Sequence, residues 1–299
     1  MAAANPPRPD QLARHGLLYT AGVVLQGSAT LLALPFATRL LGPAEYGSVA
    51  VGLSIVQIGT VLAVAGLPLA ITRAWFDAGD GPRRARAMVG LVVALGVATV
   101  LAAALVRPLV GDVVALAVAA VGATSLVIGG QAVLRAQGRP VVFVLTSIGV
   151  TAGAHLTGLA AATAGPPTAV AYLAGYLAGA SASAVVALCL TPPLPPWQVP
   201  SAAREGLRIT LPLVPHVGAV LVLNSGDPLV LTRLLGPAEA GRYQVALMLG
   251  IAALAVLAGV NNAWSTAIMS TDDRERGALL ARTVAPVMSV AAVCAVGLA

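Results

Sequence analysis

Long runs of apolar residues make up most of the chain, and short charged or Pro/Gly-rich segments separate them. Residues 140–203 contain no Asp, Glu, Lys or Arg, and neither do residues 87–106, 113–134 and 243–271. Helices that rise about 1.5 Å per residue cross a hydrocarbon layer about 30 Å thick with runs of this length. The pattern therefore predicts a polytopic membrane protein.

Cutting the chain at its charges and Pro/Gly clusters predicts about nine membrane-spanning helices. They cover residues 16–38, 47–72, 87–106, 113–133, 141–163, 169–190, 209–231, 241–268 and 283–299. The runs are continuous and rich in Ala, Leu and Val, whereas a membrane β-barrel alternates apolar and polar residues. We therefore predict an all-α helix bundle.

A proline-rich segment at residues 191–208, TPPLPPWQVPSAAREGLR, is predicted to be semi-rigid, extended and non-helical. It divides the chain at the seam between two halves. The predicted organisation is a cytoplasmic tail, a first lobe of six helices, a cytoplasmic linker and an incomplete second lobe, at residues 1–15, 16–190, 191–208 and 209–299. Within the first lobe, the pairs Gly149/Gly153 and Gly175/Gly179 predict close helix packing.

Composition supports the membrane assignment, because 58% of the 299 residues are hydrophobic and only 9% are charged. All 17 basic residues are arginines, and they are spread between the apolar runs rather than clustered, which argues against nucleic-acid binding. With a cytoplasmic N-terminus, thirteen arginines lie inside, and the four outside are Arg39, Arg107, Arg233 and Arg242. The positive-inside rule therefore predicts a multi-pass protein of the cytoplasmic membrane with its N-terminus inside.

An internal repeat is the most informative motif. Residues 38–47 read TRLLGPAEYG and residues 232–241 read TRLLGPAEAG, so nine of ten positions agree across a separation of 194 residues. Six predicted spans separate the copies, and an even number preserves their orientation in the membrane. We therefore predict parallel repeats about an axis along the membrane normal, an arrangement found in transporters with two rocking bundles.

The repeat and its surroundings resemble the oligosaccharide flippase family, the Wzx-like polysaccharide exporters of the multidrug/oligosaccharidyl-lipid/polysaccharide superfamily. TRLLGPAEYG, followed by a helix that ends in GLPLAITR, is similar to the start of that family, and LRAQGRP is similar to its link between the fourth and fifth helices. The segment 211–249 resembles its seventh and eighth helices, and 261–270 resembles the next segment of the family. Since that family has about twelve to fourteen helices, we expect the second lobe to be truncated. The chain is then a fragment, or it needs another chain.

The resemblance implies transport of a polyprenyl-pyrophosphate-linked oligosaccharide across the cytoplasmic membrane for cell-surface polysaccharide biosynthesis. The partners it implies are the lipid bilayer, the lipid-linked oligosaccharide, and a polysaccharide polymerase or glycosyltransferases. A multidrug or cation antiporter of the same superfamily is one alternative. A non-transporting membrane scaffold for polysaccharide synthesis, such as that of lipopolysaccharide or exopolysaccharide, is another.

Catalysis is not expected. The chain has no glycine-rich phosphate loop followed by lysine, no histidine pair at metal spacing and no GxSxG elbow. We therefore expect no enzyme activity, no catalytic residue, no metal and no cofactor.

Polar residues at membrane depth are the candidates for a transport path, because an ionisable group there is costly and usually faces a cavity. Asp227 is the best case, with Asn224 close before it and Pro228 after it. The alternative is a structural role near the outer surface, in which Asp227 pairs with Arg233 or Arg242. The sequence alone leaves both open.

Four further residues are weaker candidates for the path. His216 and His155 could line an aqueous path or bind phosphate, or each could make an interhelical hydrogen bond. Gln26 is a polar residue within the first predicted span. Arg73 could meet a pyrophosphate, because guanidinium matches phosphate oxygens, or it could simply anchor the topology.

Overall fold

A computed structural model of the chain describes residues 9–64, 66–77, 79–247, 277 and 288–289. Within these residues every regular element is a helix, which confirms the all-α prediction. In the described part of the chain, five helices are long and apolar enough to cross a membrane: Pro35–Val64, Gly81–Val110, Asp112–Ala136, Pro140–Ala164 and Ala169–Leu190. The predicted spans 241–268 and 283–299 lie outside the described residues, except that a helix beginning at residue 237 is described up to residue 247.

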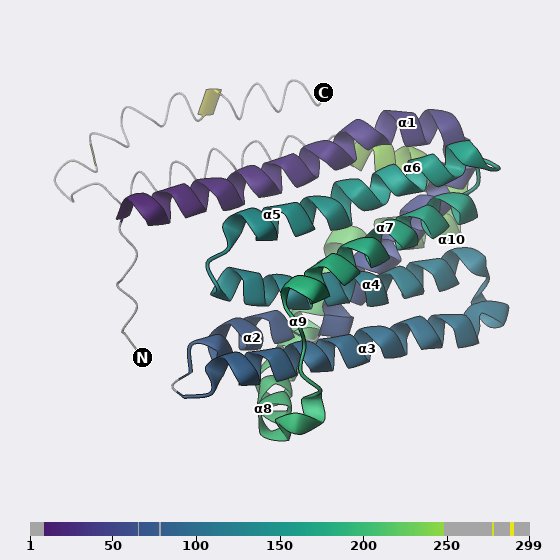
Figure 1. The fold of residues 1–299 in the computed structure, drawn as a ribbon. Helices are drawn as coiled ribbons and strands as arrows, with labels where there is room; N and C mark the ends of the chain where they lie inside the picture. Colours follow the sequence, from purple (N-terminus) through teal and green to yellow (C-terminus); the bar gives the residue numbers. More distant parts are fainter. Residues whose placement is uncertain (1–8, 65, 78, 248–276, 278–287, 290–299) are drawn as a thin grey trace.

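The elements follow one another as a series of up-and-down helices (Figure 1). The first part consists of α1 (Pro9–Val64), α2 (Leu67–Trp75), α3 (Gly81–Val110), α4 (Asp112–Ala136), α5 (Pro140–Ile148), the π-helical turn η1 (Gly149–Gly153), α6 (Ala154–Ala164) and α7 (Ala169–Leu190). The second part consists of η2 (Pro196–Gln198), α8 (Pro200–Thr210), η3 (Leu211–Leu213), α9 (Val214–Ser225) and α10 (Asp227–Leu235).

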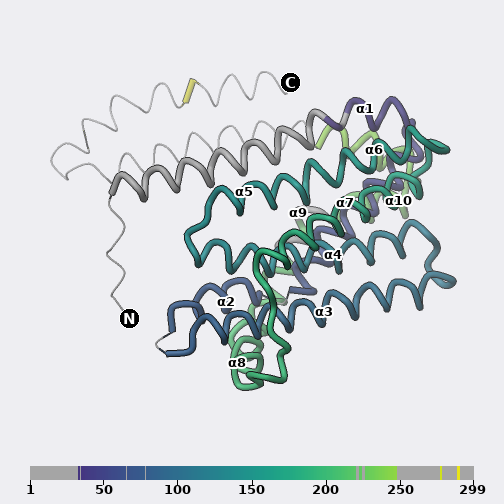
Figure 2. The backbone as a smooth tube through the Cα atoms, in the orientation of Figure 1, coloured from purple at the N-terminus to yellow at the C-terminus, as the bar shows by residue number. Residues whose placement is uncertain are grey.

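Helix α4 lies at the centre of the first part and packs against α1, α3 and α7 (Figure 2). Its buried side is almost entirely alanine, glycine and valine, so neighbouring backbones approach it closely. The opposite sides of the outer helices carry exposed leucines, for example Leu101, Leu105 and Leu109 on α3. Small residues therefore face the protein, and large apolar residues face the surrounding lipid.

Helix α1 has two arms that meet at Gly42 and Pro43. Gly42 has φ 73° and ψ 172°, and the ring of Pro43 prevents the helix from continuing through this point. The first arm begins at Pro9, so residues 9–15 of the predicted tail are helical. The second arm ends at Val64, and Gly66, with φ 70°, separates it from α2. The predicted continuous span 47–72 is therefore wrong, because a glycine in a left-handed conformation breaks it.

The linker at residues 191–208 also differs from the prediction of an extended segment. Residues up to Val199 contain only one short turn, but an α-helix runs from Pro200 to Thr210. Proline is compatible with the first turn of a helix because its missing N–H has no partner there, so Pro200 starts α8 rather than preventing it. The linker returns along α3, where Leu194 N–H donates to the Arg86 carbonyl over 3.0 Å and Arg86 Nε donates to the Pro192 carbonyl over 2.7 Å.

The two glycine pairs of the first lobe behave differently. A Cβ on Gly175 would overlap the carbonyl oxygen of Thr157, and one on Gly179 would overlap the Thr157 hydroxyl, so this pair does bring α6 and α7 together. A Cβ on Gly149 would lie 2.9 Å from the Ser183 hydroxyl oxygen, whereas at Gly153 the nearest atom is 3.8 Å away. Both belong to the π-helical turn η1, but only a Cβ on Gly149 would meet a side chain of α7.

We expect Gly175→Ala to destabilise the bundle and Gly153→Ala to be tolerated. The first change forces α6 and α7 apart at a cost of about 1–3 kcal/mol, which lowers Tm by roughly 3–8 °C. The second has room for the methyl group and gains up to about 1 kcal/mol from the higher helix propensity of alanine. Thermal unfolding of the two purified variants in the same detergent measures the difference. Equal Tm values would show that this contact does not determine helix spacing.

Candidate functional site

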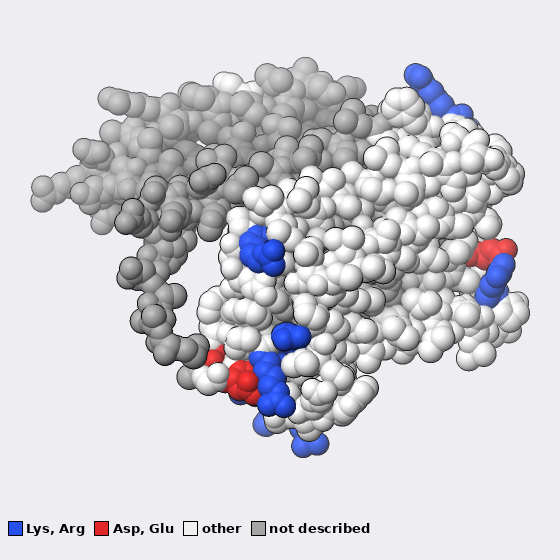
Figure 3. Space-filling view, viewed as in Figure 1, with Lys and Arg blue, Asp and Glu red and all other residues white. Residues whose placement is uncertain are grey.

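Charged side chains gather at the two ends of the bundle and leave an uncharged band between them (Figure 3). One end, the repeat-loop end, holds both copies of the decapeptide together with Arg39, Arg107, Arg233 and Arg242. The opposite end, the arginine-rich end, holds the α2–α3, α4–α5 and α7–α8 connections. Its described arginines are Arg73, Arg83, Arg84, Arg86, Arg135, Arg139, Arg204 and Arg208.

The two repeat loops contact each other directly. A Cβ on Gly47 would overlap the carbonyl oxygen of Pro237, and a Cβ on Gly241 would overlap the carbonyl oxygen of Pro43. Position 237 is the repeat equivalent of 43, and 241 is the equivalent of 47, so each copy makes the same contact with the other. Both loops therefore lie at one end of the molecule, as parallel repeats require, and they join the halves there.

The surroundings of the two loops differ despite their near-identical sequences. Glu45 of the first copy accepts a hydrogen bond from the backbone N–H of Ala169 over 2.6 Å, at the start of α7, where helix N–H groups lack intrahelical partners. Its equivalent Glu239 pairs instead with Arg242 of its own turn. Tyr46 is buried in the core of the first lobe, whereas the equivalent Ala240 is a small buried residue. Sequence reasoning did not identify the role of Glu45.

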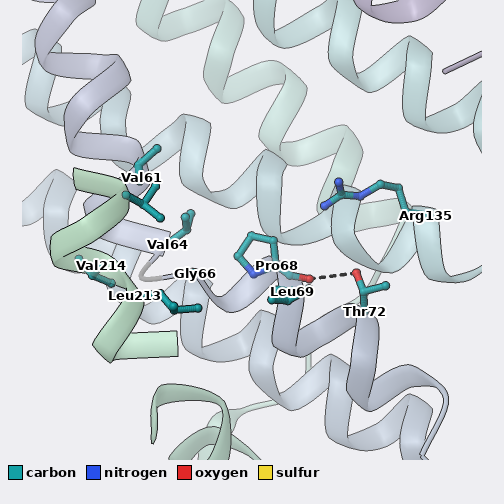
Figure 4. A pocket seen from close by; sticks show the side chains of 10 residues that line it. Val61, Val64, Gly66, Pro68, Leu69, Thr72, Arg135, Leu213 and Val214 are labelled. Atoms are coloured by element: carbon teal, nitrogen blue, oxygen red, sulfur yellow. Dashed lines mark hydrogen bonds between the residues drawn. The ribbon is translucent and has the colours of Figure 1, made fainter. Parts of the chain in front are cut away.

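A cavity of about 460 Å³ lies toward the arginine-rich end, between the first lobe and the beginning of the second (Figure 4). The second arm of α1 and helix α2 form one wall, the end of α4 contributes Arg135, and Leu213, Val214 and Val217 form the opposite wall. Gly66, the break between α1 and α2, also lines it. Non-helical backbone at membrane depth is tolerated where it lines a cavity, so the break and the cavity occur together.

Arg135 supplies the only charged side chain among the described residues that line this cavity. Its guanidinium lies 5.6 Å from the centre of the Phe143 ring, which holds it by a cation–π contact. The other polar side chain, Thr72, donates to the Pro68 carbonyl over 2.9 Å and is therefore occupied by backbone. The site is an apolar cavity with a single cation at its edge.

A second cavity, of about 520 Å³, lies nearer the repeat-loop end. Val51, Ile55 and Val114 line it from the first lobe, and residues of α10 that include Thr232 and Arg233 line it from the second. Both cavities thus lie along the seam between the halves, and the contact of the repeat loops lies at one end of that seam.

Asp227 does not make either of the predicted ion pairs. It begins α10 and accepts a hydrogen bond from the Tyr243 hydroxyl over 2.5 Å, while Arg242 pairs with Glu239. Of the two roles left open for Asp227, the pairing with Arg233 or Arg242 is therefore not the one formed, because the carboxylate bonds to Tyr243 and Arg242 bonds to Glu239. Asp227 is half-exposed at the first turn of α10, where the helix N-terminus favours a negative charge. Asn224 belongs to α9, but its side chain lies outside the described part.

The remaining sequence candidates do not converge on one place. His155 Nδ1 lies 2.7 Å from the Tyr172 hydroxyl, an interhelical hydrogen bond between α6 and α7. His216 is exposed near the start of α9, and Arg73 is exposed on α2, and neither lines either of the two cavities described above. Gln26 lies on the first arm of α1, and its side chain is outside the described part. The cavity cation is Arg135, which the sequence marks only as a topology arginine.

The described residues contain no group of three or more His, Cys, Asp or Glu side chains placed to hold a metal ion. The polar side chains that line the two cavities are those of Thr72, Arg135, Thr232 and Arg233.

Comparison with solved structures shows which fold the chain shares. The chain is similar to a structure of the MATE multidrug transporter DinF-BH in complex with a ligand, with a TM-score of 0.54 and 13% identity. The match covers 97% of this chain and 71% of that one, so the two share a fold. A search of curated proteins finds no match.

The family follows from the sequence. The model of a family described as polysaccharide biosynthesis protein matches residues 12–265, which is most of the chain. The chain therefore belongs to this family, and the resemblance found from its motifs is confirmed. Family and fold together place it in the superfamily of membrane transporters that includes flippases and MATE proteins.

We expect Gly47→Ala to open the contact between the repeat loops, because the added methyl group collides with the Pro237 carbonyl. A collision cost of about 1–3 kcal/mol shifts the equilibrium toward separated loops by at least about fivefold. The buried residue Ala240 reports this change when it is replaced by cysteine in a chain without Cys189 and Cys294. The rate of maleimide labelling at position 240 should rise by that factor in detergent.

Gly165→Ala is the matched control for this experiment. It lies at the same end and has an extended backbone that any residue adopts, and its Cβ would meet the Ala161 carbonyl oxygen at an ordinary 3.6 Å. Labelling should stay unchanged in this variant. An unchanged rate in the Gly47→Ala variant would contradict the assignment of the glycine contact as the joint between the halves.

Proposed function

We propose that this protein moves a polyprenyl-pyrophosphate-linked oligosaccharide across the cytoplasmic membrane for cell-surface polysaccharide biosynthesis. The observation that carries the proposal is the mostly apolar cavity between the repeats, in which Arg135 is the one charged side chain among the described lining residues. Membership of the polysaccharide biosynthesis family supports the cargo class. The protein would act as a transporter without enzymatic chemistry and without a cofactor.

The chemistry of the cavity matches the two parts of such a cargo. A pyrophosphate carries phosphate oxygens that a guanidinium can bind through paired, charge-assisted hydrogen bonds. A polyprenyl chain needs apolar walls, and Val61, Val64 and Leu69 supply them beside Arg135. Because the repeat loops close the other end of the seam, cargo would enter from the arginine-rich end. Separation of the loops would then release it on the opposite side of the membrane.

A multidrug exporter is the second candidate. Two observations favour it. The cavity wall is mostly apolar, and the fold is similar to that of a multidrug transporter. The two functions differ in their dependence on Arg135. A pyrophosphate needs the cation, whereas a cationic drug would be repelled by it.

Replacing Arg135 by Gln should lower the rate of flipping by about tenfold, because one charge-assisted hydrogen bond contributes roughly 1.5–3 kcal/mol. The assay is leaflet-resolved translocation of a fluorescent polyprenyl-pyrophosphate oligosaccharide in vesicles that contain the full chain. Arg139→Gln is the matched control. It removes the same charge four residues further along, just before α5, but does not line the cavity, so its rate should stay within about twofold of the wild type.

Three outcomes would count against the proposed function. No movement of the labelled lipid by the wild-type protein supports a scaffold. Equal rates for Arg135→Gln and the wild type remove the cavity from the path. Faster export of an aromatic cation by Arg135→Gln, without lipid flipping by the wild type, supports the multidrug alternative.

The orientation of the chain is a separate prediction. We expect the N-terminus and the arginine-rich end in the cytoplasm, because that places most arginines inside. In a chain without its native cysteines, Ser48→Cys should react with an impermeant maleimide in intact cells, and Gly277→Cys should react only after permeabilisation. Labelling at position 277 in intact cells would reverse the assignment.

A further inference from the structure

Helix α8 exposes an unusual combination of side chains at the arginine-rich end. Arg204 and Arg208 lie one turn apart on its outer side, with Trp197 before the helix and Leu211 after it. The exposed fraction is 76% for Trp197 and 58% for Leu211. We call these four residues the α8 surface. They place two guanidinium groups between two exposed apolar side chains.

The opposite side of α8 fixes the helix to the bundle. Ala202, Gly206 and Thr210, four residues apart in turn, are buried. A Cβ on Gly206 would lie 3.2 Å from Leu67 of α2 and 3.3 Å from Met88 of α3, so the helix lies directly against both. Arg204 and Arg208 are therefore held in a fixed position on the side of α8 that faces away from the bundle.

Charge pairing leaves the two arginines of the α8 surface without a carboxylate. Glu205, the acidic residue of α8, pairs with Arg84 of α3, which also pairs with Asp77 at 3.7 Å. Arg83 pairs with Asp80. Within the described part of the chain, no salt bridge involves Arg204 or Arg208, so their charge is available to an external anion.

The depth of α8 in the membrane determines which anion its two arginines would contact. The uncharged band of the molecule ends where the blue and red side chains of this end begin (Figure 3). Tryptophan and amphipathic helices favour this depth, the boundary between headgroups and acyl chains. Neither arginine lines the cavity between the repeats, so the α8 surface is separate from the proposed cargo site.

We propose that the α8 surface binds the headgroups of anionic phospholipids of the surrounding membrane. Arg204 and Arg208 would hold the phosphates, and Trp197 and Leu211 would enter the layer just below them. Each basic side chain near a membrane surface raises the local concentration of anionic lipid by roughly fivefold. The interaction concerns bulk membrane lipid and stands whether or not the chain moves an oligosaccharide.

Fluorescence of Trp197 tests this proposal in the full chain. Trp75→Phe and Trp264→Phe leave Trp197 as the single tryptophan, and the protein is placed in vesicles of phosphatidylcholine with phosphatidylglycerol at a low mole fraction. Either the anionic or the neutral lipid carries bromine atoms, which quench a tryptophan in contact with them. We expect quenching by brominated phosphatidylglycerol to exceed that by the same mole fraction of brominated phosphatidylcholine by at least about threefold.

Two paired variants separate local binding from overall charge. Arg204→Gln with Arg208→Gln should remove the preference, and Arg204→Lys with Arg208→Lys should retain it if α8 stays folded. Arg73→Gln with Arg139→Gln removes the same net charge from the same end and should leave the preference unchanged. Equal quenching by both lipids in the wild type would overturn the proposal. An equal loss of the lipid preference in the Arg73/Arg139 variant would assign the preference to net charge and would overturn the proposal as well.

Discussion

The backbone must satisfy its own hydrogen bonds inside a bilayer, and this constraint explains where the chain is helical and where it breaks. The long spans, such as α3 and α4, pair their N–H and C=O groups internally. A break in a helix at membrane depth is tolerated where the free backbone groups line a cavity. Gly66 interrupts the chain where it lines the cavity between the repeats, so the same break that ends a helix also shapes the candidate transport site.

Small residues then determine how closely the helices approach. Helices α6 and α7 meet across Gly175 and Gly179, and the repeat loops meet across Gly47 and Gly241. In lipid there is no hydrophobic drive between helices, so close van der Waals contact of this kind is a main source of stability. The first pair builds one lobe, whereas the second joins the two halves at one end and leaves the cavities along the rest of the seam.

Continuous apolar runs between charges were sufficient to predict several spans, and tertiary contacts explain what these runs did not show. The predicted helix 169–190 coincides with α7, because Pro and Thr residues mark both ends of this uncharged run. Helix α8 was missed because prolines hid a buried face made of Ala202, Gly206 and Thr210. Arg135 was missed for a different reason: the sequence singled out Arg73 as the arginine for a phosphate, and only packing shows that Arg135 is the one that lines a cavity. The Tyr243 partner of Asp227 likewise depends on how two helices meet.

The reciprocal contact of the repeat loops has a consequence for how the two halves could diverge. The two copies use the same surface to contact each other, as in a symmetric dimer interface. A bulkier residue at the contact in either copy would collide with the other copy. The contact therefore restricts substitutions in both decapeptides more than in the helices that flank them. The one difference, Tyr46 against Ala240, occurs where the first copy points into its own lobe. The near-identity of the two decapeptides thus fits an interface in which each copy is the contact surface of the other.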